Sequence, residues 1–229
     1  ISSVTMNTID KYGFGFELGA LGMDRENLNR IIVGGRGHTD YKGFINIIEY
    51  INDEWTIVLY EQGNVSEYLG MYGVGMSGNG NYAFAKGRQN SGGSSPTKIY
   101  ERAANGTWSV IATFTKANYS DLGNNFGYDA EMNYAGDMMV FCNYTDANAL
   151  IYKNISGTWT KMGNKITSVA YPWACCLDKE GNQVALGSGH STSGGLEIYE
   201  YSKTLTETNG TWERKYYIDQ SIQRVAVST

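Results

Sequence analysis

The sequence predicts an all-β protein built from repeated antiparallel sheets, and three observations carry this prediction. Four tryptophans, Trp55, Trp108, Trp159 and Trp212, follow one another at intervals of 53, 51 and 53 residues. A fixed period of this length is typical of one supersecondary unit copied in tandem. The 229 residues include 29 Gly and 18 Tyr, a composition typical of short strands joined by tight turns. No segment keeps the 3.6-residue apolar period of a helix for more than a turn.

Each period is expected to contain four strands in the same order. A Gly- and aromatic-rich strand comes first, at 11–19, 68–76, 124–132 and 169–177. After a polar turn, a short apolar strand follows at 31–35, 82–87, 138–143 and 183–188. A third, alternating strand follows at 44–50, 97–102, 149–154 and 196–201, and the fourth begins at the repeated Trp. Four antiparallel strands per period predict a β-propeller of four-stranded antiparallel blades, at least four in this chain, with a larger ring as the alternative.

The tryptophans and the first-strand glycines have structural interpretations in this fold. A Trp at the start of the fourth strand would pack between neighbouring blades, as a large apolar contact made once per unit. Small residues in the first strand would let the strands approach a central channel closely. These residues are Gly13, Gly15, Gly73, Gly75, Gly127, Ala130 and Ala174. Trp173 lies outside the periodic series and is expected either in the core or along the channel.

The domain prediction is a single propeller over residues 1–229. Its units are roughly 11–67, 68–123, 124–166 and 167–220, and 221–229 resembles either the start of a further blade or a closing strand. The chain begins with Ile rather than Met, so it is expected to be a processed product or an excerpt of something longer.

A family resemblance is visible in the third and fourth units. "NNFGYDAEMNYAGDMMVFCNY" followed by "ALIYKNISGTWTKMGNKI", and "DKEGNQVALGSG" followed by "LEIYEY" and "NGTW", resemble FG-GAP (integrin-α-like) propeller repeats. The likeness extends from residue 11 to about 220. It implies an extracellular protein, because members include integrin head domains, bacterial surface proteins and repeat proteins of large DNA viruses; the viral group is the most similar in style.

Charge and hydropathy argue against two classes of partner. The net charge is −5 and no basic cluster is present, whereas nucleic acid demands a concentrated Lys/Arg surface. No apolar run approaches the roughly 20 residues of a membrane-spanning helix, so no membrane insertion is expected.

Metal binding is tested first at the turns between the first and second strands, because the resemblance implies Ca²⁺ there in some family members. The acidic and amide candidates are Asp24, Glu26, Asn133, Asp137, Asp178 and Glu180. Ca²⁺ takes 6–8 oxygen ligands, usually with several carboxylates in one loop. None of these turns has that acidic density, so ordinary hairpin turns are favoured and no metal residue is assigned.

The remaining reactive residues do not form a catalytic set. His38 and His190 fall in matching loops after the second strand; solvated loop histidines are favoured, with ligand contact as the alternative. Cys142, Cys175 and Cys176 are expected as buried thiols, with a bridge from Cys142 to one of the pair as the alternative. No nucleophile–base pair or cofactor fingerprint appears. No catalytic or cofactor-binding residue is assigned, and the chain is predicted not to be an enzyme.

Six N-glycosylation sequons are present, at Asn64, Asn105, Asn118, Asn143, Asn154 and Asn209. Turn chemistry also produces Asn-Gly-Thr, and turns are favoured here over glycan attachment.

The function predicted from these observations is a non-enzymatic platform for adhesion or protein assembly on a virion or cell surface. Variable loops at 34–43, 87–97 and 188–195 would carry recognition while the strands position them. Their sequences differ between units, which favours protein partners over glycans. The alternative is a carbohydrate-binding propeller whose exposed Tyr and Trp stack on sugars; an enzyme that uses the central channel is a third and weaker hypothesis.

Overall fold

The computed structural model describes residues 21–35, 41–71, 73–87, 96–123, 126–168, 171–188, 194–203 and 209–219. These residues form strands and one short 3-10 helix, η1 (Ser120–Leu122), and none of them lies in an α-helix. The chain divides into two compact units, residues 1–120 and 121–229. Each unit contains two antiparallel sheets, called blades 1 to 4 in chain order.

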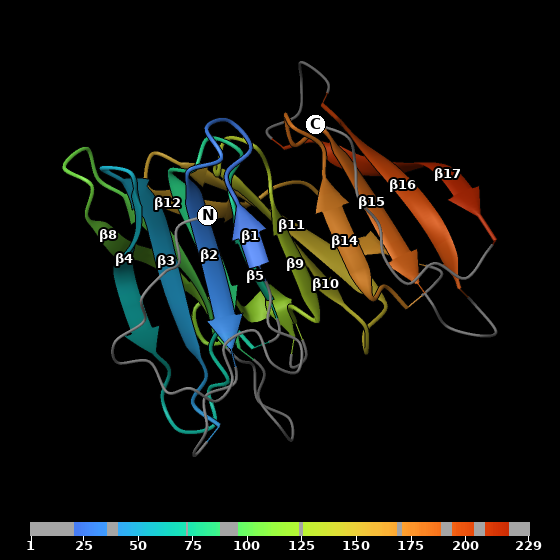
Figure 1. Cartoon of the computed structure of the whole chain (residues 1–229). Helices are drawn as coiled ribbons and strands as arrows, with labels where there is room; N and C mark the ends of the chain where they lie inside the picture. Colours follow the sequence, from blue (N-terminus) through green and yellow to red (C-terminus); the bar gives the residue numbers. More distant parts are fainter. Residues whose placement is uncertain are drawn as a thin grey trace. The chain divides into compact units, whose positions relative to one another are not determined.

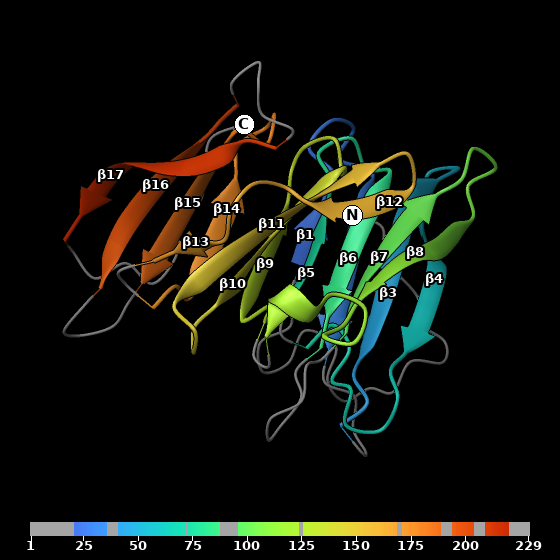
Figure 2. The same ribbon diagram turned by 180° about the vertical axis from the view of Figure 1, so that it is seen from behind.

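Unit 1 holds blades 1 and 2, in which sequential strands lie side by side (Figure 1). Blade 1 consists of β1 (Leu21–Met23), β2 (Arg30–Gly35), β3 (Phe44–Ile51) and β4 (Glu54–Gln62). Blade 2 consists of β5 (Gly73–Met76), β6 (Tyr82–Lys86), β7 (Thr97–Arg102) and β8 (Trp108–Phe114), seen from the other side in Figure 2.

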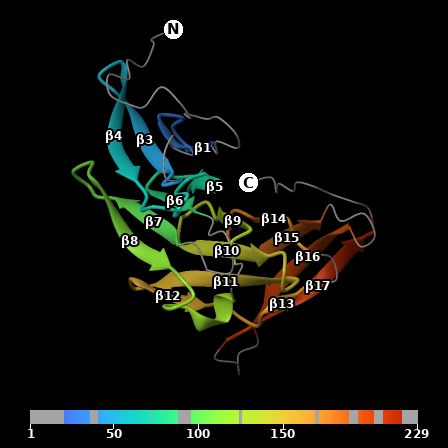
Figure 3. The same cartoon turned by 90° about the horizontal axis from the view of Figure 1, so that it is seen from below.

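Unit 2 holds blades 3 and 4. Blade 3 consists of β9 (Asp129–Met132), β10 (Met138–Asn143), β11 (Asn148–Ile155), β12 (Thr158–Lys161) and the two-residue β13 (Ile166–Thr167). Blade 4 consists of β14 (Ala174–Leu177), β15 (Gln183–Ser188), β16 (Gly195–Ser202) and β17 (Thr211–Ile218), which follow one another across the sheet in Figure 3.

The second and third strands of every blade lie where the sequence predicts them, but two features differ. The first strands differ from the prediction. β5, β9 and β14 occupy only the last four residues of the predicted segments. In blade 1 the strand that pairs with β2 is β1 (Leu21–Met23) rather than the predicted 11–19, which lies outside the described residues. The fourth strand of blade 3 is broken, because Gly163 adopts a positive φ of 75°. The chain then returns as β13 to pair with β11.

The core lies between consecutive blades of each unit rather than within one sheet. In unit 1 the buried cluster joins Ile32, Ile45, Ile47 and Leu69 to Val74, Met76, Ala83, Ala85, Tyr100 and Trp108. In unit 2 the corresponding cluster joins Met138, Val140, Cys142, Ala149, Ile151 and Ile166 to Cys175, Leu177, Val184, Leu186, Tyr199 and Trp212. Burial of apolar area between blades is therefore the main stabilising contribution in both units.

The repeated Trp closes this interface by reaching back to the preceding blade. Trp108 donates its indole N–H to Glu49 of blade 1 at 2.7 Å, and Trp212 donates to the Met162 carbonyl of blade 3 at 2.8 Å. Both indoles are buried, so the predicted packing between neighbouring blades is confirmed within each unit. Trp55 is different: it is only half-buried, and its ring lies 5.4 Å from that of Tyr50.

Of the predicted first-strand glycines, Gly75 allows the close approach that was expected, whereas Gly127 lies in the turn before β9 with a positive φ of 69°. Gly22 of β1, which was not in the predicted set, allows the same close approach. A Cβ built on Gly75 would lie 2.3 Å from the Phe84 ring, and one on Gly22 of β1 would lie 2.8 Å from Gly75 of β5. These distances are shorter than any real Cβ contact, so the inner strands of blades 1 and 2 approach closely only because both positions are Gly.

Replacing Trp108 by Phe tests the polar part of this interface. The variant keeps an aromatic ring but leaves the buried Glu49 without one donor, so we expect the free energy of unfolding to fall by about 1.5–3 kcal/mol. Trp55→Phe is the matched control, and we expect a loss below about 1 kcal/mol because this indole is half-buried. Urea unfolding followed by circular dichroism measures both values; equal losses would contradict the interface role.

Candidate functional site

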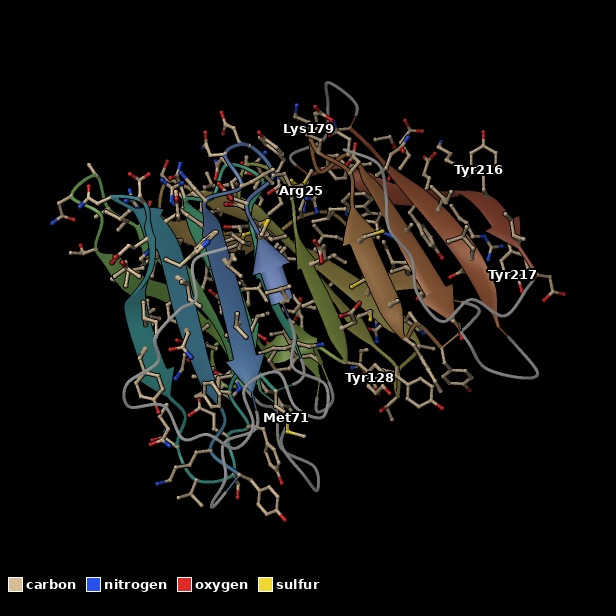
Figure 4. The ribbon with its side chains drawn as sticks, viewed as in Figure 1. Arg25, Met71, Tyr128, Lys179, Tyr216 and Tyr217 are labelled. Atoms are coloured by element: carbon tan, nitrogen blue, oxygen red, sulfur yellow. The ribbon has the colours of Figure 1, made fainter. Side chains whose placement is uncertain are left out.

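Four aromatic side chains gather at one end of unit 2 and form the candidate site, called here the aromatic cluster. Tyr128 lies just before β9, Tyr144 in the turn from β10 to β11, and Tyr171 and Trp173 in the segment that leads into β14. The ring of Tyr144 lies 5.6 Å from that of Tyr128, 5.6 Å from that of Tyr171 and 5.4 Å from that of Trp173. Tyr128 and Trp173 are 6.1 Å apart. Figure 4 labels Tyr128 at this end of the unit.

The backbone holds the aromatic cluster in place. The Tyr128 N–H donates to the carbonyl of Cys142, and the Trp173 N–H donates to that of Gly187. A side-chain bond adds to these, since the N–H of Cys175 on β14 donates to the Asp129 carboxylate at 3.0 Å. The rings are therefore anchored on strand ends rather than on a long loop, so little ordering entropy would be lost when a partner binds.

The aromatic cluster is open to solvent on its outer side. Tyr128 is 48% exposed and Tyr171 is 40% exposed, whereas Tyr144, which contacts both, and Trp173 are half-buried. Exposed Tyr and Trp side chains packed against other aromatic rings are typical of binding hot spots, in which both residue types are enriched.

A second polar constellation, around Glu49, belongs to the interface between blades 1 and 2. Arg102 donates to both carboxylate oxygens of Glu49, at 2.8 and 3.0 Å, and Trp108 adds its indole N–H. The Arg30 guanidinium lies 3.8 Å from the same carboxylate. Burial raises the pKa of Glu49, but the bonds from Arg102 and Trp108 and the charges of both arginines outweigh burial and leave the pKa below its ordinary value. Because every oxygen is engaged and the group is buried, this carboxylate supports the structure.

A similar network joins the outer parts of the same two blades. Lys98 lies 2.8 Å from the carboxylates of both Glu61 and Glu67, and the Tyr100 hydroxyl donates to Glu61 at 2.9 Å. Burial lowers the pKa of Lys98, but the two carboxylates outweigh it and raise the pKa above the ordinary value. Burial and the charge of Glu61 raise the pKa of Tyr100. The Lys98 ammonium is thus held charged as a structural cation rather than as a base.

The turn residues considered for Ca²⁺ hold the turns themselves. Asp24 accepts the backbone N–H groups of Asn29 and Arg30. Asn133 accepts those of Gly136 and Met138, and Asp178 accepts that of Gln183. Of the other candidates, Glu26 and Glu180 are exposed, and Asp137 accepts a bond from the Asn133 amide. Within the described part of the chain, no cluster of three or more His, Cys, Asp or Glu could hold a metal ion.

The other residues singled out in the sequence do not come together. His38 and His190 lie outside the described residues, as do much of the loops that contain them. Cys142, Cys175 and Cys176 are buried, as the sequence predicts. Among the described residues no helix is long and apolar enough to cross a membrane.

Two of the sequon asparagines stabilise turns. The side-chain oxygen of Asn105 accepts the N–H of Thr107, and that of Asn154 accepts the N–H of Gly157. The side-chain oxygen of Asn209 instead accepts the N–H of Gly163, between β12 and β13 of blade 3. The turn interpretation is supported at Asn105 and Asn154, and the glycosylation state stays a prediction.

Solved structures of similar architecture decide the fold. A functionally unknown protein from Desulfotomaculum acetoxidans matches with a TM-score of 0.64 at 12% identity, over 93% of this chain and 60% of that one. The Cps50 (Swd1) β-propeller domain of Myceliophteria thermophila matches with a TM-score of 0.55 at 11% identity, over 80% of this chain and 53% of that one. The chain has a β-propeller fold. The predicted fold class is therefore confirmed.

The periplasmic gluconolactonase of Pseudomonas aeruginosa is also similar, with a TM-score of 0.56 at 12% identity over 89% of this chain and 55% of that one. The chain spans between about half and three-fifths of the length of these proteins. No family model matches the chain, and no curated protein matches it. At these identities the likeness shows the fold alone.

The gluconolactonase corrects one prediction. The chain was expected not to be an enzyme, because no nucleophile–base pair or cofactor fingerprint stands out in its sequence. That prediction is wrong, because an enzyme shares the fold. Function has to be argued from sites, since the same fold hosts both catalysis and binding.

The Glu49 network generates a pH prediction. The folded pKa of Glu49 lies below its unfolded value of about 4.3, so its contribution to stability is complete above the unfolded pKa and is lost as the pH falls through the folded pKa. We expect Glu49→Gln to lower the free energy of unfolding by about 1–3 kcal/mol at neutral pH and by progressively less below about pH 4. Urea unfolding across a pH series, with the exposed Glu54→Gln as control, measures this difference. A difference that grew on acidification would contradict the prediction.

Proposed function

We propose that the chain is a protein-interaction propeller that binds a protein partner through the aromatic cluster of unit 2. The observation that carries the proposal is the pairing of exposed Tyr128 and Tyr171 with a fixed base of Tyr144 and Trp173. Solvent-exposed aromatic area on a rigid scaffold binds at low entropic cost.

The ring orientations favour a protein partner over a sugar. Neighbouring rings are inclined by 40° for Tyr128 and Tyr144, 53° for Tyr144 and Tyr171, and 74° for Tyr144 and Trp173. Rings inclined to one another do not present the single flat aromatic face on which a pyranose ring stacks, so they favour contact with protein side chains. Carbohydrate binding remains the alternative that the exposed rings allow.

The setting that we propose is the exterior of a cell or a virion, where the platform would serve adhesion or assembly. The support is the resemblance of the third and fourth units to FG-GAP repeats, in "NNFGYDAEM" and "ISGTWTKMG". FG-GAP membership is likewise a proposal based on those repeated motifs.

The test is affinity capture followed by measured binding of the captured protein to variants. We expect Tyr128→Ala combined with Tyr171→Ala to weaken this binding at least about 30-fold, because hot-spot side chains contribute 2 kcal/mol or more. The control is Tyr60→Ala, an exposed tyrosine of unit 1 outside the aromatic cluster. The variants should unfold at the same urea concentration as the parent chain.

Two results would contradict the proposal. One is undiminished binding by the double variant. The other is a glycan-array signal that the parent chain gives and the double variant loses, which would assign the aromatic cluster to carbohydrate instead.

A further inference from the structure

The aromatic cluster shares its end of unit 2 with an exposed carboxylate. Asp146 stands two residues after Tyr144, in the same turn from β10 to β11, so their Cα atoms are at most about 7 Å apart. Asp146 is exposed, and it forms no ion pair with any residue that the structure describes. The surface that carries the exposed rings therefore also carries a negative charge without a counter-ion.

The turn itself holds the Asp146 carboxylate in place. Oδ2 accepts the side-chain amide of Asn143 at 2.8 Å, and the Asp146 N–H donates to Asn143 Oδ1 at 3.2 Å. Oδ2 also lies against the backbone of Gly123, since a Cβ built there would be 2.7 Å away. The other oxygen, Oδ1, accepts no hydrogen bond from the described residues. The carboxylate is thus fixed in direction and can still accept a charged donor.

The lysines in the strands of blade 3 are engaged elsewhere. Lys161 pairs with Asp121 of η1, two residues before Gly123. Lys153 lies 3.7 Å from the carboxylate of Asp137. Neither lysine therefore supplies a counter-charge to Asp146.

Arg214 of the same unit shows how this chain holds a guanidinium. Its Nη1 donates to the Glu197 carboxylate at 3.1 Å, while its Cζ lies 5.5 Å from the centre of the Tyr217 ring. A guanidinium bonds to carboxylates and stacks on aromatic faces. Asp146 and the exposed tyrosines of the aromatic cluster offer the same two kinds of group to a partner.

The position of the aromatic cluster favours a separate partner over a further blade in series. Consecutive blades cover one another face to face, through side chains of their paired strands. The four rings stand instead before β9, in the turn from β10 to β11 and before β14, all at strand ends. A blade packed on either sheet face would leave this end of the strands open.

We propose that the partner binds the aromatic cluster with an arginine side chain, whose guanidinium stacks on Tyr128 or Tyr171 and donates to Asp146. The inference rests on the proposed function and specifies the partner, a protein segment that presents arginine. Arginine fits this surface better than lysine, because its planar guanidinium stacks on a ring and bonds to a carboxylate at the same time.

Short synthetic peptides test the arginine directly. The probes are capped glycine peptides with one central residue: arginine, lysine, or citrulline, which keeps the shape of arginine without its charge. Each peptide is titrated into the full chain while the indole N–H signal of Trp173, assigned with Trp173→Phe, is followed by NMR. We expect the arginine peptide to shift this signal and to bind at least about threefold more tightly than either of the others.

The matched variants are Asp146→Asn and Asp53→Asn. We expect Asp146→Asn to bind the arginine peptide about threefold less tightly than the parent chain and to lose the preference over citrulline. Asp53 is an exposed aspartate of unit 1, so Asp53→Asn should bind like the parent chain. Because both side chains are exposed, both variants should unfold at the same urea concentration as the parent chain.

Three results would overturn the inference: no shift with the arginine peptide, equally tight binding of the citrulline or lysine peptide, or undiminished binding by Asp146→Asn. None of them would overturn the proposed function. That function fails only on its own test, in which the captured protein binds the parent chain and the variant with Tyr128→Ala and Tyr171→Ala.

Discussion

Each four-stranded sheet of this chain has a face of apolar side chains, and within each unit a neighbouring sheet buries that face. The rest of the structure depends on this contact between sheets. Strand pairing within a blade satisfies the backbone, but the buried side chains of each unit belong to two blades at once. The repeated indole and the third-strand Tyr reach back to the preceding blade and combine apolar burial with one hydrogen bond. Because these contacts recur at the same strand positions, each sequence repeat forms one sheet and also covers the apolar face of the preceding sheet.

The sequence predicts the strands and turns of each repeat correctly where short-range residue patterns determine them. The alternating third strands and the turns with Gly and Asn were located correctly because each depends on short-range chemistry. The break after Lys161 depends on Gly163 and on bonds from blade 4 to Asn164 and Met162, which the period does not reveal. Trp55 matches the other tryptophans in spacing but not in burial, because the spacing does not specify what covers each copy.

The aromatic cluster was harder to predict than the fold. Tyr128, Tyr144 and Tyr171 stand in three different turns, and only the adjacency of β9 and β14 brings them to Trp173. The one available signal was Trp173, an indole outside the periodic series. By contrast, the buried charges around Glu49 and Lys98 are paired with one another, so they hold blades 1 and 2 in register and were not assigned to the candidate site.

A double-mutant cycle between Trp108 and Glu49 measures the bond between blades most directly. Trp108→Phe, Glu49→Gln and the double variant, unfolded in urea at neutral pH, give the coupling free energy between the two side chains. If the indole and the carboxylate join blades 1 and 2 as described, the coupling should exceed about 1 kcal/mol. Losses that add to within about 0.5 kcal/mol would show that the two side chains act independently, and would contradict the interblade contact on which the fold depends.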